Sequence, residues 1–329
     1  MLLNKDYYKD NDGMIWQAPK ADDEYVWRYD GNPLFDIPKM KKFWHICNSA
    51  VVMKDGKYIG VFRCEDKRGV PDLYMGYSND GANWTLEEEP IVFYEEDGTP
   101  FKYLYSYDPR LVKIEDEYYV IFCSDTEMGP SIYTAKTKDF KRWVKHPNGF
   151  LPFNRNGVLF PEKINGNYVM LNRPSDTGNT PFGSIYMSES PDMRYWGNHK
   201  LVMKNFYKDT CYWERIKIGA GPAPIKTEKG WLLIYHGVQQ TCNSWTYSFG
   251  VALLDLNDPS KVVARAPIYL LTPETDYERS GFTDNVCFPC TALVDSEGKI
   301  AIYYGVADTN MAIAFTTVEK LFQFLEDNQ

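Results

Sequence analysis

Apolar and polar positions alternate along this chain in short stretches, and a period of two is typical of β-strands. One unit occurs five times. It has a turn with Gly, Asp or Glu beside Lys or Asn, an aromatic or apolar start, a short apolar strand and a polar or glycine tip. The copies are KDGKYIGVFR (54–63), IEDEYYVIFC (114–123), INGNYVMLNR (164–173), TEKGWLLIYH (227–236) and SEGKIAIYYG (296–305). Each copy predicts a tight hairpin and the strand that follows it.

A second pattern follows several hairpins: a strand-like start, a polar bend and a Trp. It is found at 77–85, 133–143 and 186–196, with a diverged copy at 251–265. The aligned hairpins lie 60, 50, 63 and 69 residues apart, and units of this size built from short strands are typical of propeller blades. We therefore predict an all-β fold, a five-bladed β-propeller that residues 1–329 form as a single domain. A two-sheet sandwich stays open, because strand periodicity alone does not separate the two folds.

The convincing helical pattern lies near the C-terminus. Residues 318–327, VEKLFQFLED, predict a short C-terminal helix that closes the fold. The tryptophans of the second pattern, Trp84, Trp143 and Trp196, are predicted to pack between strands of their blades.

The five aligned strands end on side chains that a propeller would bring together. These ends are Arg63, Cys123, Arg173, His236 and Gly305. Equivalent positions of successive blades converge on the axis, so two Arg and one His are expected at one end of the channel. A single His at a strand end is often only structural. Three cationic groups at one repeat position favour a binding site instead.

Two further polar residues share an offset in the preceding strands. Asn48 and Asp108 each lie ten residues before the aligned Tyr of their repeat. We therefore expect Asp108 to face the same axial region as Asn48, Arg63 and Arg173. The alternative is that Asp108, in the bend of Asp-Pro-Arg, only caps its own backbone.

The motifs YDPRLVKI, LFPEKINGNYVMLNRP, WERIKIGAGPAPIKTEKGWLLIYHGV and YYGVADT together resemble glycoside hydrolase family 130. The resemblance extends from about Asn48 to Asp308, with several motifs in the family's order. It implies a five-bladed β-propeller and mannoside phosphorylase activity, with a smaller set of hydrolases in the same family.

The resemblance also implies roles for individual residues. Asp108 of the Asp-Pro-Arg motif matches the catalytic acid. The family's positions that hold the mannosyl unit at the non-reducing end match Asn48, Ser49, Arg63 and Asp308. The family's phosphate pocket matches Arg155, Arg173, Lys217 and His236, with Tyr247 at its border. Two positions depart from the family's pattern: Asn172 stands where a His is expected, and Ser248 follows Tyr247 where an Arg is common. The loop residue Trp245 is a candidate for contact with the acceptor sugar.

Phosphorolysis explains why such a cationic set is needed. Desolvating an anion without partners would cost several kcal/mol, and Arg, Lys and His donors offset that cost with charge-assisted hydrogen bonds. An inverting hydrolase instead needs a second carboxylate roughly 6.5–9.5 Å from the acid to activate water. A phosphorylase needs only the acid, and no metal or other cofactor is expected, because inorganic phosphate is the co-substrate.

Composition narrows the choice of partner and compartment. A net charge of −9 argues against a nucleic-acid partner. No stretch of 18 apolar residues predicts a membrane span, and the N-terminus lacks the apolar core of a secretory signal. Seven scattered cysteines suit reduced thiols in the cytoplasm, and Cys287 and Cys290 are expected to be buried structural thiols. Homo-oligomers are common among such enzymes, and the sequence leaves the oligomeric state open.

The leading hypothesis is an inverting β-mannoside phosphorylase that releases α-D-mannose 1-phosphate, with β-1,4-mannooligosaccharides as the expected substrates. β-1,2-mannobiose, mannosylglucose and mannosyl-N-acetylglucosamine are alternative substrates. An inverting β-mannosidase and a non-catalytic sugar-binding propeller are the competing functions.

Overall fold

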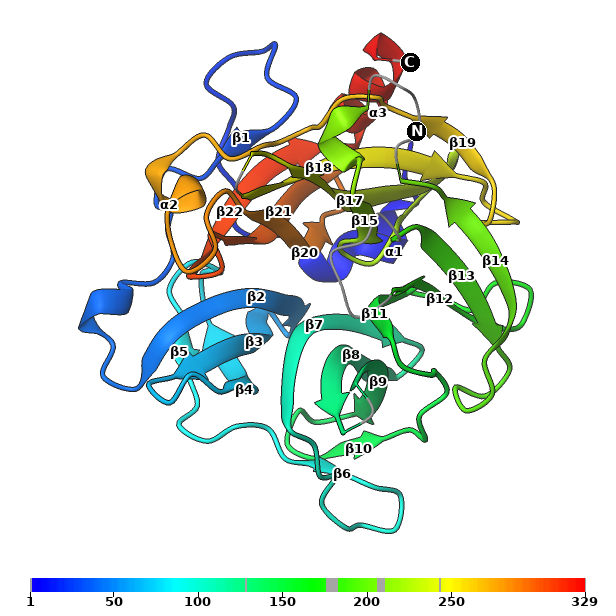
Figure 1. The fold of residues 1–329 in the computed structure, drawn as a ribbon. Helices are drawn as coiled ribbons and strands as arrows, with labels where there is room; N and C mark the ends of the chain where they lie inside the picture. The colour runs from blue at the N-terminus through cyan, green and yellow to red at the C-terminus, as the bar shows by residue number, and fades with distance from the viewer. Residues whose placement is uncertain (1, 128, 176–182, 206–210, 243, 329) are drawn as a thin grey trace.

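The computed structural model describes residues 2–127, 129–175, 183–205, 211–242 and 244–328. These residues form five sheets arranged around a central axis (Figure 1). The predicted all-β, five-bladed β-propeller with a short C-terminal helix is therefore confirmed. The assignment of residues 1–329 to one domain stays a prediction.

Each sheet is one blade, and successive blades follow one another along the chain. Blade I contains β2 (Phe43–Lys54), β3 (Lys57–Asp66), β4 (Pro71–Ser78) and β5 (Thr85–Leu86). Blade II contains β6 (Phe93–Tyr94), β7 (Tyr105–Ile114), β8 (Glu117–Thr126), β9 (Gly129–Thr137) and β10 (Trp143–Lys145). Blade III contains β11 (Asn154–Leu159), β12 (Tyr168–Pro174), β13 (Ile185–Ser190) and β14 (Gly197–Met203).

The last two blades are built in the same way. Blade IV contains β15 (Lys217–Ala220), β16 (Ile225–Thr227), β17 (Gly230–Gln240), β18 (Trp245–Leu254) and β19 (Val262–Arg265), preceded by the 3-10 helix η3 (Tyr212–Glu214). Blade V contains β20 (Cys287–Val294), β21 (Lys299–Val306), β22 (Asn310–Thr317) and the N-terminal strand β1 (Trp27–Arg28). The remaining helices are α1 (Lys5–Tyr8), η1 (Lys9–Asn11), η2 (Ile37–Lys39), α2 (Asp276–Arg279) and α3 (Val318–Asp327).

The five predicted hairpins each join two neighbouring antiparallel strands of one blade. In blade I the turn residues Asp55 and Gly56 both have positive φ, +52° and +72°. Asn165 and Gly166 repeat this conformation in blade III, with φ of +52° and +84°. Two consecutive left-handed residues match the right-handed twist of the flanking strands, which explains the Asp-Gly and Asn-Gly pairs.

The second repeated pattern forms the bends between outer strands. In three blades a hydroxyl accepts a hydrogen bond from the backbone N–H three residues later: Ser78 from Gly81 (2.9 Å), Thr137 from Phe140 (3.0 Å) and Ser190 from Met193 (2.8 Å). An Asp two residues after each hydroxyl accepts from further backbone N–H groups of the bend. The polar residues of the pattern therefore satisfy the backbone where each strand turns.

The core lies between neighbouring blades. Phe62 of blade I packs in one apolar cluster with Tyr303 and Phe315 of blade V, and all three are fully buried. Trp143 is also fully buried, and Trp84 packs edge-on against Phe62, as predicted for blade packing. Helix α3 buries apolar side chains that include Leu321 and Phe324 against blades IV and V, and Thr317 caps its first turn.

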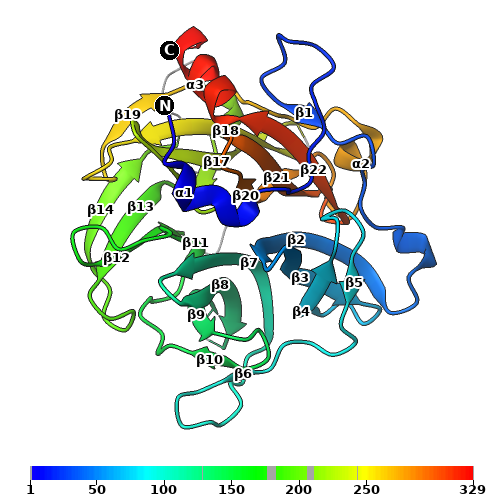
Figure 2. The same cartoon turned by 180° about the vertical axis from the view of Figure 1, so that it is seen from behind.

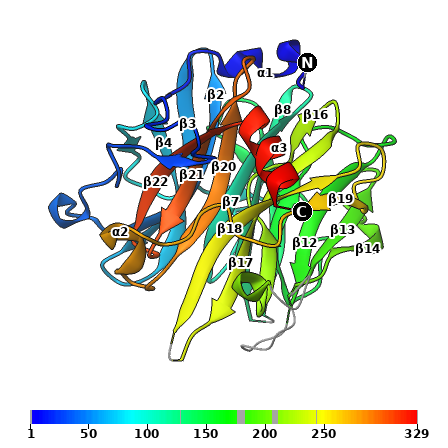
Figure 3. The same ribbon diagram turned by 90° about the horizontal axis from the view of Figure 1, so that it is seen from above.

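The N-terminal segment closes the ring and covers one end of the axis. Strand β1 pairs antiparallel with β22, so the last blade is completed by the start of the chain. Seen from behind, α1 and η1 lie across the axis (Figure 2). A cavity of about 330 Å³ beneath them is lined by Tyr8 and by the second halves of β2, β7 and β20. The hairpin β17–β18 extends on the opposite face (Figure 3).

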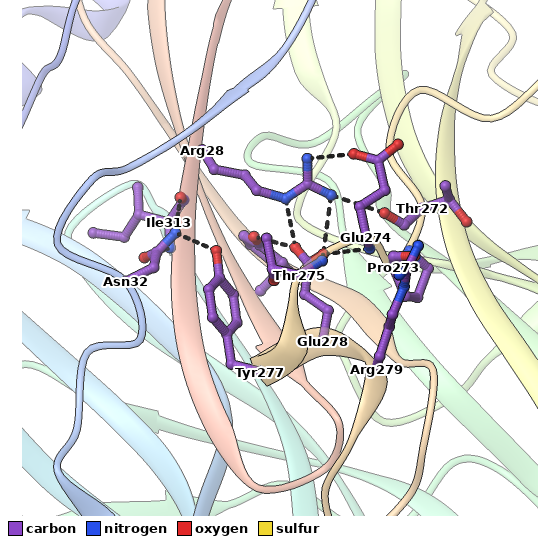
Figure 4. A network of polar contacts seen from close by, with 11 residues as sticks. Arg28, Asn32, Thr272, Pro273, Glu274, Thr275, Tyr277, Glu278, Arg279 and Ile313 are labelled. Atoms are coloured by element: carbon purple, nitrogen blue, oxygen red, sulfur yellow. Dashed lines mark hydrogen bonds and ion pairs between the residues drawn. The ribbon is translucent and has the colours of Figure 1, made fainter.

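A buried ion pair ties this closing strand to the α2 segment (Figure 4). Arg28 Nε and Nη2 donate to the two carboxylate oxygens of Glu278 at 2.7 and 3.0 Å, and Nη1 donates to Glu274 at 2.9 Å. Glu278 also accepts from the backbone N–H groups of Glu274 and Thr275. The Glu278 carboxylate is fully buried, so it depends on these donors for its solvation.

Replacing Arg28 with Met is therefore expected to lower the free energy of unfolding by about 3 kcal/mol, because it leaves a buried carboxylate without its cation. Urea unfolding measures the change. The control is Arg68→Met, which breaks an exposed pair with Asp66 and should cost about 1 kcal/mol or less. Equal losses in the two variants would contradict a structural role for the Arg28–Glu278 pair.

Candidate active site

β-Bulges interrupt the first strands of the blades at the axis. The register shifts by one residue at Asn48 in β2, at Asp108-Pro109 in β7, at Asn156-Gly157 in β11 and at Cys290 in β20. Asn48, Asp108 and Asn156 all have φ of 52–53°, in the left-handed region that Asn and Asp tolerate better than other side chains. A bulge re-aims the side chain of its extra residue. Three blades thereby direct short polar side chains out of the pleat at the axis.

Asp108 contacts two donors from blade I. Asn48 Nδ2 donates to Asp108 Oδ1 at 2.7 Å, and Arg63 Nη1 donates to the same oxygen at 3.4 Å. Arg63 Nη2 also donates to Glu65 Oε1 at 2.9 Å. The structure therefore brings together three predicted residues, Asn48, Arg63 and Asp108, and Glu65 contacts them through Arg63. We call these four residues, together with Asp308, the acid group.

Asp308 belongs to this group because its carboxyl interacts electrostatically with Arg63 and Asp108. Burial raises the pKa of the Asp308 carboxyl, while Arg63 and a hydrogen bond from Thr283 act in the opposite direction. Burial alone would lower the pKa of Arg63, but Cys47, Asp108, Asp308 and Glu65 together raise it. Arg63 therefore stays charged between several acidic groups.

Ser49 is placed differently from the other predicted mannosyl contacts. It is fully buried in β2, its carbonyl accepts from Thr291 Oγ1 at 3.3 Å, and its hydroxyl makes no hydrogen bond to the described residues. The structure joins Ser49 to the site through its chain neighbour Asn48 rather than through a side-chain contact.

Arg173 and His236 meet on the other side of the axis. Arg173 Nη1 lies 3.2 Å from His236 Nε2 and donates to the Ile218 carbonyl at 3.4 Å. A guanidinium only donates, so Nε2 must accept and the imidazole proton resides on Nδ1. Burial, followed by the charges of Arg173, Arg110 and Lys217, lowers the pKa of His236 well below its usual range, so the ring is neutral.

Lys217 and Arg155 complete a cationic group with Arg173 and His236. Lys217 Nζ lies 4.3 Å from the ring centroid of Trp245 and 5.6 Å from that of Tyr247. Arg155 pairs with Arg173 across strands β11 and β12, and its Nη1 donates to Ser175 Oγ at 3.1 Å. Trp245 therefore covers the Lys217 ammonium, and its contact with the acceptor sugar stays a prediction.

The described residues leave the charge of the cationic group uncompensated. In the described part of the chain, Arg155, Arg173 and Lys217 make no ion pair with a carboxylate. Burial and then the charges of Arg173 and Arg155 lower the pKa of Lys217 to about 7. Burial also lowers the pKa of Arg173 to about 10, although Tyr247 and Asp108 counteract this effect. Burial raises the pKa of Tyr247, which keeps the phenol neutral.

Unsatisfied polar atoms gather at the same place. Among the described residues, five buried side-chain atoms around the axis have no hydrogen-bond partner: Ser49 Oγ, Arg63 Nε, Asn156 Oδ1, Arg173 Nε and His236 Nδ1. Buried polar groups normally find partners, so a cluster of unpaired ones indicates atoms that a ligand would satisfy.

The glycines beside His236 leave room for its neighbours. A Cβ at Gly237 would stand 2.5 Å from the Trp213 ring, and a Cβ at Gly219 would collide with the imidazole. These contacts explain why glycine follows His236 and lies opposite it. Strand β17 continues to Gln240, so His236 lies within the strand and not at its end as expected.

Sequence reasoning missed Asn156 and Glu65. Asn156 lies twelve residues before the aligned Tyr168, not ten, so the shared offset of Asn48 and Asp108 does not reach it. Glu65 lies two residues after Arg63 on the same face of β3, a signal the pattern did carry. Asn172, where a His was expected, is buried and bonds to Ser188 and Asn154 within blade III.

The cysteines are free thiols. Cys287 and Cys290 are both buried and unbridged, as expected of structural thiols. In the part of the chain that the structure describes, no three His, Cys, Asp or Glu side chains are grouped to hold a metal ion.

Comparison with known proteins gives matches over most of the chain. A family model described as β-1,4-mannooligosaccharide phosphorylase matches residues 23–327. A β-1,4-mannooligosaccharide phosphorylase of Ruminococcus albus is 46% identical over 321 residues, which cover 95% of this chain and 95% of the relative. A β-1,2-mannobiose phosphorylase of Listeria innocua is 37% identical over 77% of this chain and 68% of its own length.

A solved structure agrees with these matches. The β-1,2-mannobiose phosphorylase of Listeria innocua in complex with β-1,2-mannobiose has a TM-score of 0.81 at 28% identity. The similarity covers 92% of this chain and 99% of that one.

Proposed function

This chain belongs to glycoside hydrolase family 130, and from that premise we propose that it catalyses the inverting phosphorolysis of β-mannosides from the non-reducing end, releasing α-D-mannose 1-phosphate. The observation that carries the proposal is the cationic group of Arg155, Arg173 and Lys217 around the neutral His236, which makes no ion pair with a carboxylate among the described residues. Three cations without carboxylates favour a bound polyanion, and inorganic phosphate is the anion that this chemistry requires.

Asp108 is the proposed catalytic acid. Asn48 and Arg63 both donate to Oδ1, which leaves Oδ2 to carry the transferable proton. As the bond between the anomeric carbon and the leaving oxygen breaks, that oxygen takes the proton, directly or through a sugar hydroxyl. The carboxylate that forms at Asp108 is then stabilised by the same two donors.

Phosphate is the proposed nucleophile. The cationic group would hold it facing the anomeric carbon, so that one phosphate oxygen forms the new bond from the face opposite the leaving group and inverts the configuration. Arg173 and Lys217 supply charge, and the proton on His236 Nδ1 supplies a neutral donor. Tyr247 borders the phosphate beside Lys217. Asn48, Ser49, Arg63 and Asp308 are the proposed mannosyl contacts.

β-1,4-Mannooligosaccharides are the proposed substrates, because the Ruminococcus albus relative bears that name and matches 95% of the chain. Rates with β-1,4-mannobiose, β-1,2-mannobiose and mannosylglucose, each with phosphate, test this choice. The same assay without phosphate separates the competing functions. A hydrolase would release mannose at an undiminished rate, and a sugar-binding propeller would release none in either buffer.

The charge on Lys217 predicts the pH dependence of phosphate use. Its pKa of about 7 means that the ammonium is charged below this pH and neutral above it. kcat/KM for phosphate, which reports the enzyme form that phosphate binds, is therefore expected to fall about tenfold as the pH rises through 7, because a charged donor is lost. Initial rates at saturating mannobiose and varied phosphate measure this profile.

Phosphate itself also ionises near neutral pH, so the control is Lys217→Met. This variant keeps the apolar stem and lacks the titrating group, and only the ionisation of phosphate should remain in its profile. The same alkaline fall in wild type and variant would contradict the assignment to Lys217.

The remaining proposals concern the cellular compartment, the partners and the cofactor of the protein. We place the protein in the cytoplasm because all seven cysteines are free thiols, six of them buried. Among the described helices, none is long and apolar enough to cross a membrane. A net charge of −9 disfavours nucleic acid as a partner. No cofactor is required by the proposed reaction.

A further inference from the structure

Arg110, the third residue of the Asp-Pro-Arg motif, has no role in the reaction as described so far. It is 3% exposed, in β7 directly after the bulge that carries Asp108. Arg110 lines the cavity of about 330 Å³ at the rear of the axis, whereas the Asp108 carboxylate contacts Asn48 and Arg63. Arg110 therefore lies behind the proposed acid on the same strand.

The guanidinium of Arg110 binds backbone carbonyls of three blades. Nη1 donates to Pro109 O at 2.9 Å and to Asp108 O at 3.4 Å, within the bulge itself. Nε donates to Gly221 O at 2.6 Å in blade IV, and Nη2 lies 3.5 Å from Pro289 O at the β20 bulge of blade V. One side chain thus links the backbone of the acid to the two blades across the axis.

The charge of Arg110 is not explained by an ion pair. In the regions that the structure describes, it makes no salt bridge, and its partners are carbonyl oxygens and the ring of Phe288 at 5.2 Å. The same ring lies 4.6 Å from the centroid of His236. A buried charge is costly, and a rigid five-donor fork is the side chain that can bind several carbonyls at once.

Resting on the proposed phosphorolysis, we propose that Arg110 is a positioning residue that holds the Asp108 carboxyl in line with the leaving oxygen by clamping the β7 bulge to blades IV and V. The bulge is left-handed at Asp108, with φ of +53°, so its direction depends on what holds its carbonyls. A misplacement of about 1 Å can cost about 100-fold in rate.

Leaving-group dependence separates positioning of the acid from general damage. Arg110→Lys keeps the charge but cannot bind three blades at once. It is expected to lower kcat on mannobiose, whose leaving sugar needs a proton, about tenfold or more. With 4-nitrophenyl β-mannoside, whose leaving group needs little protonation, the loss should be at most about threefold. Arg110→Gln is measured in the same way and keeps the test open if the Lys variant does not fold.

The matched control is Lys145→Met, which removes another buried cation of blade II at the outer strand β10. It should lower the melting temperature and leave both rates of the folded protein unchanged. Equal losses on the two substrates, or mannobiose rates within about twofold of wild type, would overturn the inference. Wild type that forms no mannose 1-phosphate would refute the proposed function, whereas an active wild type with unaffected variants would refute only the role of Arg110.

Discussion

Replacing Asp108 with Asn is expected to reduce turnover of mannobiose by about 100-fold or more. The amide has nearly the same shape as the carboxyl but no acidic proton to transfer to the leaving oxygen. Asn48 and Arg63 can still donate to the amide oxygen at 108, and Asn tolerates the φ of +53° at this position. The substitution therefore removes the proton without removing the fold.

Steady-state kinetics on purified protein measures this effect, with thermal unfolding as a check on structure. Asp80→Asn is the matched control, because Asp80 caps the bend between the outer strands β4 and β5 of blade I. That variant should keep wild-type turnover. Near-normal turnover of folded Asp108→Asn would exclude Asp108 as the acid.

Replacing Arg173 with Ala is expected to lower kcat/KM for phosphate by roughly 10- to 150-fold, the effect of losing a charged hydrogen-bond partner. His236→Ala should act in the same direction but more weakly, because its imidazole is a neutral donor. The control is Arg142, an exposed arginine that packs over Tyr94 in blade II. Arg142→Ala should leave phosphate kinetics unchanged.

The Arg173 variant also carries a signature that general damage would not produce. The charge of Arg173 helps to lower the pKa of Lys217 to about 7. Without Arg173, the alkaline fall in phosphate use should move to higher pH, because Lys217 keeps its proton longer. A lower rate with an unmoved pH profile would contradict the placement of both cations around one anion.

The local elements of the fold were predictable from the sequence because they depend on nearby residues. The five hairpins follow from Asp-Gly, Asn-Gly and similar turns, and α3 follows from its apolar face between 318 and 327. Ring closure was not predictable in this way. Strand β1 is two residues long and pairs with Phe315 at the other end of the chain, and α2 is a single capped turn.

The site also has a part that was predictable from the sequence and a part that was not. Arg63, Arg173 and His236 stand at one repeat position, so their approach to the axis could be expected from spacing. Cys123 and Gly305 share that position but bring no charge. Asn156 was missed because the β11–β12 connection adds two residues, and the bulge that re-aims it leaves no trace in a hydrophobic pattern. The pairing of Arg63 with Glu65 depends on side-chain rotamers that the sequence alone does not determine.

The proposed phosphate site also predicts reversibility. A glycosyl phosphate retains much of the free energy of the glycosidic bond, whereas hydrolysis to free sugar loses it. The protein should therefore synthesise mannosides from α-D-mannose 1-phosphate and an acceptor. Arg173→Ala should slow this direction as well, because the same cation holds the phosphoryl group of the donor.

Product identity tests the central claim most directly. Mannobiose and inorganic phosphate are incubated with the protein, and the phosphorus NMR spectrum is followed alongside an assay for free mannose. The account predicts a growing α-D-mannose 1-phosphate signal, a matching loss of inorganic phosphate and no cleavage in phosphate-free buffer. Free mannose released at an undiminished rate without phosphate would contradict it.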